Sequence, residues 1–298
     1  MTIKRPEPVE SLEPGLRRVL AANPSPMTHW GTNTYIVGEG RVAIIDPGPR
    51  DRGHFKTILA ALSPGERVSH ILVTHSHLDH SSLARPLADE TGAPILAFGD
   101  SLAGRSAVMN KLAASGLAGG GEGADTKFAP DEVLTDGQII AGKDWTLSTL
   151  WTPGHFGNHL SFAWNDAVFT GDHIMAWAST LVSPPDGDLT DFMASTKMLF
   201  GRRDRVYYPG HGAPIFDPAG RAAWLLDHRR ERETSILLAL AEGARDIAAI
   251  TARTYTDVRP ALLPAAERNV FAHLIDLIHQ SRVVATPDIA FSAKYFVI

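Results

Sequence analysis

The chain has 298 residues, of which 44% are hydrophobic, and its formal net charge is -5. These values predict a globular protein with a sizeable core, built as one large domain or as a main domain with a small appendage. Cysteine is absent, which excludes disulfides, thiolate metal sites and cysteine nucleophiles, so any metal must be held by His, Asp or Glu.

The sequence also argues against a membrane or secretory protein. No apolar stretch approaches the roughly 20 residues that cross a bilayer. Residues 1–15 (MTIKRPEPVESLEPG) lack the apolar core of a signal peptide. We therefore expect no membrane partner and a cytoplasmic location.

Short apolar runs bounded by Gly, Pro, Asn or Asp dominate the first two thirds of the chain and predict strands. They fall at residues 32–38, 42–48, 70–75, 94–99, 145–155, 160–173 and 205–212. Helical spacing of apolar residues occurs between them at 54–62 and 81–92, and Ser81 and Ser82 are expected to cap the second helix. This order predicts an α/β fold in which helices cover a mixed sheet arrangement.

A glycine-rich segment, residues 114–131 (ASGLAGGGEGADTKFAPD), interrupts this pattern. Long loops without regular structure often serve a function. The segment is therefore either a surface connection or a mobile flap over a site, and the sequence does not choose between the two.

From Arg221 onward the pattern becomes mostly helical. Three helices are predicted, at 221–243, 245–255 and 263–281. Gly243 provides the stop for the first of them, and the tail, residues 282–298, is predicted to form two short strands. Three helices and a hairpin are typical of a small winged-helix domain. We therefore divide the chain into a main domain, 1–220, and a winged-helix-like C-terminal domain, 221–298.

The stretch LVTHSHLDHS, residues 72–81, places three histidines and an aspartate directly after an apolar run. On extended backbone His75 and His77 point to the same side, and Asp79 and His80 follow on the turn into the next helix. Four protonatable groups this close would repel or desolvate one another, and a cation removes that conflict. The pattern therefore predicts ligands for two adjacent metal ions.

Three later segments follow the same plan, in which an apolar strand ends in Gly beside a possible ligand. They are WTPGH with His155, VFTGDH with Asp172 and YYPGHG with His211. Strand ends next to glycine turns allow a rigid scaffold to direct side chains at one point. We expect these three residues to join the motif in one metal centre.

With these motifs, residues 30–217 resemble the metallo-β-lactamase-fold hydrolase superfamily. The resemblance implies a four-layered αββα sandwich with two metal ions at its edge. It also implies the ligands of each ion: His75, His77 and His155 for one, Asp79, His80 and His211 for the other, and Asp172 as the bridge. Asp79 would in addition orient the attacking water as a catalytic residue.

Imidazole and carboxylate ligands suit zinc, with manganese or iron as the other candidates. Two divalent metal ions about 3.5 to 4 Å apart share a water, deprotonate it near neutral pH and stabilise an oxyanion, so a metal-bound hydroxide is the nucleophile. Members of the family act on thioesters, lactones, β-lactams and phosphodiesters. The resemblance therefore implies a metallohydrolase and leaves the bond that it breaks open.

The C-terminal region narrows the choice within the family. Residues 228–290 resemble the winged-helix domain of a subgroup that includes β-lactamase-like endoribonucleases specific for single strands. Residues 229–298 carry nine Lys and Arg against eight Asp and Glu, which is less basic than a duplex-binding surface requires. The domain therefore packs against the main domain, forms a homodimer contact or holds RNA. The substrate is either single-stranded RNA or a small ester or thioester.

Two other functional classes stay open. Some relatives use iron at a similar site for persulfide or oxygen chemistry, and an iron-dependent oxidoreductase is the alternative function, although the diiron type departs from the motif at the position of His77. A non-catalytic binding module is the third class, and the complete ligand set argues against it. Outside that set, His159 and His173 are expected either to support the centre or to pack as ordinary polar residues, and Trp177 either to line the cleft or to lie in the core.

Overall fold

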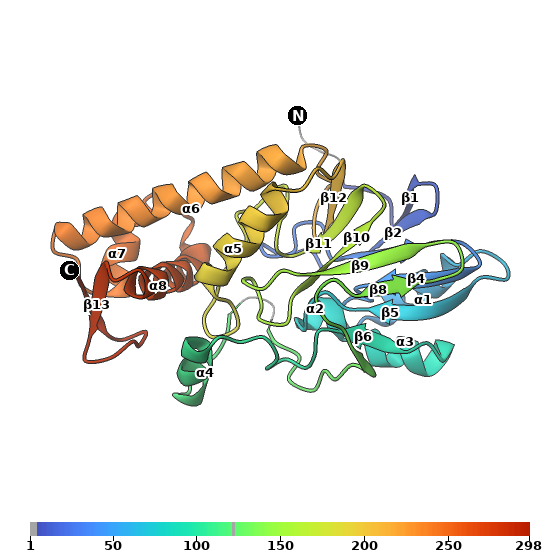
Figure 1. Ribbon diagram of the computed structural model, residues 1–298, viewed down its shortest axis with the longest axis horizontal. Coiled ribbons are helices and arrows are strands. Elements are labelled where there is room, and N and C mark those ends of the chain that lie inside the picture. The colour runs from blue at the N-terminus through green and yellow to red at the C-terminus, as the bar shows by residue number, and fades with distance from the viewer. Residues whose placement is uncertain (1–4, 121–122) are drawn as a thin grey trace.

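Two β-sheets form the main part of the computed structural model, which describes residues 5–120 and 123–298 (Figure 1). Seven strands form the first sheet in chain order: β1 (Val9–Glu13), β2 (Leu16–Leu20), β3 (Asn33–Val37), β4 (Arg41–Ile45), β5 (Arg67–Leu72), β6 (Ile95–Ala97) and β7 (Glu132–Val133). Neighbouring strands are antiparallel as far as β4 and parallel from β4 to β7.

Five strands form the second sheet, in the order β12 (Val206–Pro209), β11 (Ala167–Gly171), β10 (Leu160–Trp164), β9 (Thr146–Trp151) and β8 (Ile139–Ala141). Only β11 and β12 pair in parallel there. The main hydrophobic core lies between the two sheets, where Tyr35 of β3 packs against Phe169 of β11 with ring centroids 5.0 Å apart. Both sheets therefore turn an apolar face toward one shared core.

Four helices cover the outer faces of the sheets: α1 (Arg52–Ala60) and α3 (Ala84–Thr91) on the first, α5 (Leu189–Phe200) and α6 (Pro218–Ala241) on the second. Ile58 of α1 and Leu87 of α3 are fully buried against the first sheet. Leu199 of α5 and Leu225 of α6 pack in the same way on the second. The layer order is α, β, β, α, which confirms the predicted sandwich.

The helix predicted over 81–92 is α3, which begins three residues later and is preceded by the short helix α2 (Leu78–Ser81), and the predicted capping role of the serines is wrong. Ser81 Oγ donates to the carbonyl of His77, and Ser82 Oγ donates to the carbonyl of Leu78. Each hydroxyl thus bonds the carbonyl four residues earlier and leaves the first turn of α3 without a side-chain cap.

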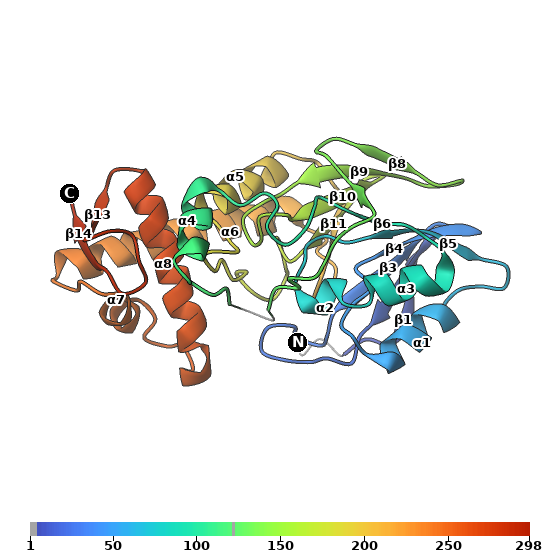
Figure 2. The same ribbon diagram turned by 90° about the horizontal axis from the view of Figure 1, so that it is seen from below.

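Several short elements had no clear periodic signal and were not predicted, among them β1, β2, β7, β8 and α4 (Ala107–Ala114). Helix α4 lies beside the C-terminal part of the molecule in both views (Figures 1 and 2). Its residues Met109 and Leu112 are buried in the core of that part. The C-terminal core is therefore completed by a segment from the first half of the chain.

The C-terminal part contains α7 (Ile247–Thr254), a 3-10 helix (Pro260–Leu262), α8 (Leu263–His279), β13 (Val283–Thr286) and β14 (Lys294–Val297). Strands β13 and β14 form the predicted antiparallel hairpin. Figure 2 shows this part to one side of the sandwich, with α8 facing it.

Helix α6 joins the two parts. Its N-cap is Asp217, whose side chain accepts from Gly220 N, and it ends before Gly243, which has a φ of +96°. Its first half packs on the second sheet and its second half, through Ile236 and Leu240, in the C-terminal core. No helix of the described residues is long and apolar enough to cross a membrane.

Candidate metal centre and its pocket

The seven predicted ligands lie together at one edge of the sandwich, and all are buried. The motif follows the carboxyl end of β5, where extended backbone places His75 and His77 before α2 carries Asp79 and His80. The other three follow the ends of β9, β11 and β12. Strand ends from both sheets thus bring the seven candidate ligands together at one point.

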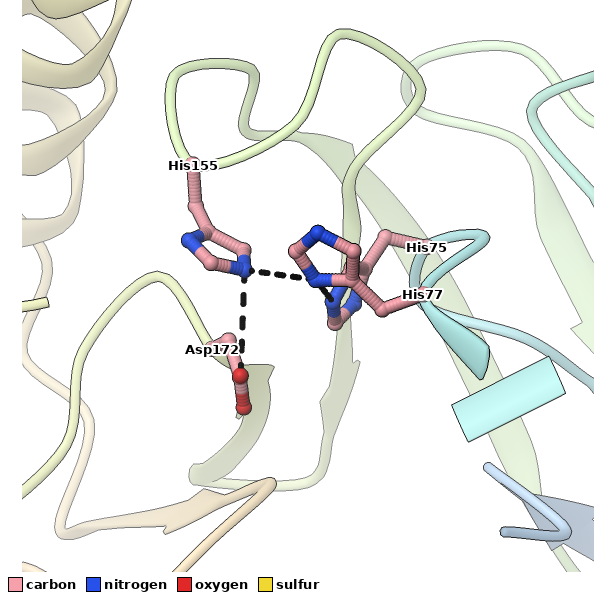
Figure 3. A group of neighbouring side chains, drawn as sticks. All are labelled: His75, His77, His155 and Asp172. Atoms are coloured by element: carbon pink, nitrogen blue, oxygen red, sulfur yellow. Dashed lines mark hydrogen bonds and ion pairs between the residues drawn. The ribbon is translucent and has the colours of Figure 1, made fainter. Parts of the chain in front are cut away.

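One group consists of His75, His77, His155 and Asp172 (Figure 3). The Nδ1 atom of His77 lies 2.9 Å from Nε2 of His75 and 3.1 Å from Nε2 of His155. The same nitrogen of His155 lies 3.7 Å from Oδ2 of Asp172. Three imidazole nitrogens and one carboxylate oxygen therefore face a common centre.

The second group consists of Asp79, His80 and His211. Oδ2 of Asp79 lies 3.2 Å from His211 Nε2 and 3.4 Å from His80 Nε2. Asp172 also reaches this group, because its Oδ2 lies 3.2 Å from His211 Nε2 and its Oδ1 lies 3.5 Å from His80 Nε2. Of the two carboxylates among the seven ligands, Asp172 is the one that contacts both groups.

The hydrogen bonds behind the centre decide which ring nitrogens face it. Thr74 Oγ1 donates to Asp46 and therefore accepts from His75 Nδ1, 3.0 Å away. Nδ1 of His155 donates to the Leu181 carbonyl at 2.7 Å. Nδ1 of His211 donates to the Gly31 carbonyl at 3.1 Å. Each of these rings thus turns Nε2 inward, which is how outer hydrogen bonds prepare histidines for a metal.

Asp46, which the sequence analysis did not single out, supports the motif from behind. It follows the end of β4, and its carboxylate accepts from the backbone N of Thr74 at 2.7 Å and from Nδ1 of His80 at 2.9 Å. Its φ is +52°, a region that Asp tolerates better than most residues. The signal was present in the sequence, since VAIIDPG is also a strand that ends in a carboxylate beside a glycine turn.

The residues fit two divalent cations. In each group the possible ligand atoms lie within 4.8 Å of one another. Oδ1 of Asp79 and Oδ1 of Asp172 are buried without a hydrogen-bond partner among the described residues, which is costly unless a cation or water completes them. A Cβ on Gly210 would clash with Oδ1 of Asp172, so glycine there leaves the carboxylate free.

The two groups differ in charge. Burial lowers the pKa of His75, of His155 and of His77, the last to about 3, so these rings are neutral at pH 7. Burial opposes charge in the second group too, but the carboxylates of Asp79 and Asp172 outweigh it there. They raise the pKa of His80 well above its usual range and that of His211 to about 10.

The same attraction acts on the carboxylates. Although burial favours their neutral forms, His80 and His211 hold the pKa values of Asp79 and Asp172 well below the usual range. Two buried carboxylates thus require positive charge, which protons on these histidines or metal cations supply.

His159, His173 and Trp177, for which the sequence left two roles open, lie near the candidate metal centre. His159 packs with its ring centroid 5.2 Å from that of His75, and its Nδ1 bonds Thr152. His173 bonds Thr196 of α5 instead. Trp177 lines the pocket in front of the centre. The six histidines that belong to no motif also lie outside both ligand groups: His29, His54, His70, His228, His273 and His279.

A cavity of about 230 Å³ opens onto His77, His155 and Asp172. The sandwich contributes Met27, Met175 and Trp177 to its walls. The C-terminal part contributes the opposite wall, which consists of Tyr255, Val258, Leu262, Ala265, Ala266 and Asn269. The lining is mostly apolar, and it includes no Lys or Arg among the described residues. The C-terminal domain is therefore part of the site.

Described residues of the glycine-rich segment contact the motif. Leu78 N donates to the Gly123 carbonyl at 2.9 Å, and Asp125 N donates to the Ser76 carbonyl at 2.7 Å. Nη1 of Arg268 on α8 donates to the Ala118 carbonyl at 2.7 Å. The described residues on either side of 121–122 thus contact both the motif and the C-terminal domain.

Two family models match the chain. One describes the metallo-beta-lactamase superfamily and matches residues 27–211. The other describes a beta-lactamase-associated winged helix domain and matches residues 247–292. The second match confirms the winged-helix prediction for the C-terminal part.

Curated proteins and solved structures are similar over most of the chain. An atrochrysone carboxyl ACP thioesterase from Aspergillus fumigatus is 30% identical over 240 residues, which are 78% of this chain and 67% of that protein. A beta-lactamase-like protein 2 homolog from Drosophila melanogaster is 29% identical over 90% of this chain and 89% of its own. A metallo-beta-lactamase family protein from Thermus thermophilus has a TM-score of 0.76 at 24% identity, over 97% of this chain and 100% of that one.

Proposed function

Because the chain belongs to the metallo-beta-lactamase superfamily and is a metallohydrolase of that family, we propose that it hydrolyses a small thioester or ester with an apolar acyl group, using two metal ions. The observation that carries this proposal is the mostly apolar cavity beside the ligands, which has no cationic side chain in its described lining. A phosphodiester substrate calls for cations along its path, whereas an acyl chain gains stability from apolar walls.

We assign His75, His77 and His155 to one metal ion, Asp79, His80 and His211 to the other, and Asp172 to both. The donor set of imidazoles and carboxylates favours zinc. Bound there, two divalent cations would lower the pKa of a water and neutralise negative charge on the attacked carbonyl oxygen.

The side chains of this protein prepare that chemistry. The hydrogen bonds from Nδ1 of His155 and of His211 to backbone carbonyls fix both rings before any ligand arrives. Oδ2 of Asp79 is held by Thr32 Oγ1 at 3.1 Å, while its Oδ1 has no partner in the described structure. We assign to Oδ1 of Asp79 the role of accepting a hydrogen bond from the attacking water.

The cavity walls orient the acyl group and exclude water from it. Each CH₂ buried against apolar walls contributes about 0.8 kcal/mol. Lengthening the acyl chain should therefore raise kcat/KM about fourfold per added carbon until the cavity is full. The homologue named as an ACP thioesterase supports the same class of bond. In this proposal the C-terminal domain, residues 221–298, serves as a wall of the acyl site.

The proposal is tested with the zinc-loaded protein and N-acetylcysteamine thioesters of two, four, six and eight carbons, beside an unstructured RNA oligonucleotide. We expect thioester turnover that rises with chain length and is lost in Asp79→Ala. RNA cleavage that disappears in the same variant, with no thioester turnover, would contradict the proposal and make the protein a nuclease.

A further inference from the structure

Among the residues of the C-terminal wall, Asn269 on α8 differs from its mostly apolar neighbours. Its side chain is partly exposed, and it lines the cavity together with Ala265 and Ala266 of the same helix. A polar group in an apolar wall either pairs within the protein or presents its hydrogen-bonding atoms to whatever fills the cavity.

The contacts of Asn269 fix the orientation of its amide group. Its Oδ1 accepts from Nη1 of Arg229 at 3.1 Å and from the backbone N of Val182 at 3.2 Å. Both partners are donors only, so the amide oxygen and not the nitrogen must lie on that side. No hydrogen bond from Nδ2 to another described residue is present, so its two N–H groups are free to bond a ligand in the cavity that Asn269 lines.

Arg229 makes this orientation rigid. It is 2% exposed, and its Nη2 donates to the carbonyls of Ser179 at 2.8 Å and Thr180 at 2.5 Å. No carboxylate of the described residues pairs with it. Burial lowers the pKa of Arg229 to about 10, which still leaves it charged at neutral pH. A guanidinium bonded to the amide oxygen makes the amide N–H groups stronger donors.

We propose that Nδ2 of Asn269 determines substrate specificity by donating a hydrogen bond to an oxygen on the acyl group, remote from the bond that is cleaved. This inference rests on the proposed thioesterase function and narrows it. The preferred substrate carries an oxo group on an otherwise apolar acyl chain, because an N–H group donates and a carbonyl oxygen can only accept. A plain acyl chain would leave the donor unpaired, which a polar site penalises.

The test variant is Asn269→Asp. Aspartate has nearly the same shape and keeps an acceptor for Arg229 and Val182 N, but it turns an acceptor instead of a donor toward the cavity. The matched control is Asn110→Asp, since Asn110 is an exposed residue of α4 outside the cavity lining. Both substitutions exchange an amide for a carboxylate.

The substrates are N-acetylcysteamine thioesters of octanoic, 5-oxooctanoic and 7-oxooctanoic acid. For at least one oxo substrate we expect kcat/KM about tenfold above that of the octanoyl ester in the wild type and in Asn110→Asp, which corresponds to one hydrogen bond to a polarised donor. In Asn269→Asp the ratio should fall to one or below. Equal kcat/KM values in the wild type, or a ratio that Asn269→Asp leaves unchanged, would overturn the inference.

A binding measurement separates this inference from the proposed function. Titration calorimetry of the three free acids should show the same preference for an oxo acid in the wild type and its loss in Asn269→Asp. If no thioester is turned over, the proposed function fails, and the calorimetric ratio alone decides whether Asn269 selects an oxo group.

Discussion

The two walls of the pocket differ in how they are built. The sandwich side carries the seven candidate ligands, of which His77, His155 and Asp172 line the pocket, and partners such as Asp46 and Thr74 orient the motif from behind. The C-terminal side presents helix residues that are mostly small or apolar, with Asn269 as a held amide. The difference suggests that reactivity and substrate choice reside in separate parts of the molecule, so that each can be disrupted while the other remains.

The largest effect is expected from Asp172→Asn. Asp172 is the carboxylate that contacts both ligand groups, and the substitution removes its charge at nearly constant shape. We expect turnover to fall by on the order of a thousandfold and the metal content to drop below two ions per chain, as measured by elemental analysis. Asp166→Asn, an exposed carboxylate on the turn after β10, is the control. Full activity with two ions in Asp172→Asn would show that no ligand is shared.

Acidification should weaken metal binding by the second ligand group more than by the first. The raised pKa values of His80 and His211, the latter about 10, mean that both are protonated at pH 7 in the metal-free protein. A metal ion must displace these protons, so affinity for the second group should fall as pH falls, by about tenfold per unit for each proton.

The first group lacks this dependence, because burial lowers the pKa of His75, His77 and His155. Between pH 8 and pH 6 we expect one ion to be lost well before the other. Equilibrium dialysis at several pH values gives the two affinities, and calorimetry in buffers of different ionisation enthalpy counts the released protons. Equal slopes for both ions would contradict the assignment of charge to the second group.

Asp46→Asn tests whether the hydrogen bonds of Asp46 to Thr74 and His80 hold the metal-binding motif in place. Asn tolerates the positive φ at this position. It keeps one oxygen that can accept a hydrogen bond, but it has no negative charge and no second oxygen, so it cannot accept from both Thr74 and His80. We expect metal affinity to fall by about tenfold to a hundredfold, as for other outer-shell partners of metal ligands. Asp51→Asn, which caps α1 at the other end of the same loop, is the control. An unchanged affinity would mean that Thr74 alone orients the motif.

The seven candidate ligands could be predicted because their signals are local, whereas the four-layered sandwich and the division of the ligands between two ions were implied by the family resemblance. Apolar strands that end beside glycine mark His155, Asp172 and His211. The strand before Asp46 carries the same signal. The cavity wall could not be predicted in this way. Asn269 lies in a helix whose pattern predicts only burial, and it lines the cavity because α6 connects the two parts of the molecule and α8 packs against α5. The helix-capping role predicted for Ser81 and Ser82 was wrong because a serine hydroxyl can bond an earlier carbonyl as well as a later N–H.

The smallest of these effects tests the C-terminal wall alone. Ala265 of α8 is partly exposed and lines the cavity, so Ala265→Phe places a ring in the acyl site without entering the packed core. We expect the ratio of kcat/KM for octanoyl over acetyl thioesters to fall by about tenfold, because the longer chain loses apolar volume. Metal content should stay at two ions, since no ligand comes from this wall. Ala261→Phe, at an exposed residue of the 3-10 helix that is not itself in the lining, should keep the wild-type ratio. If Ala265→Phe lost metal as well, the two walls would be coupled, and the C-terminal domain would shape the centre as well as the choice of substrate.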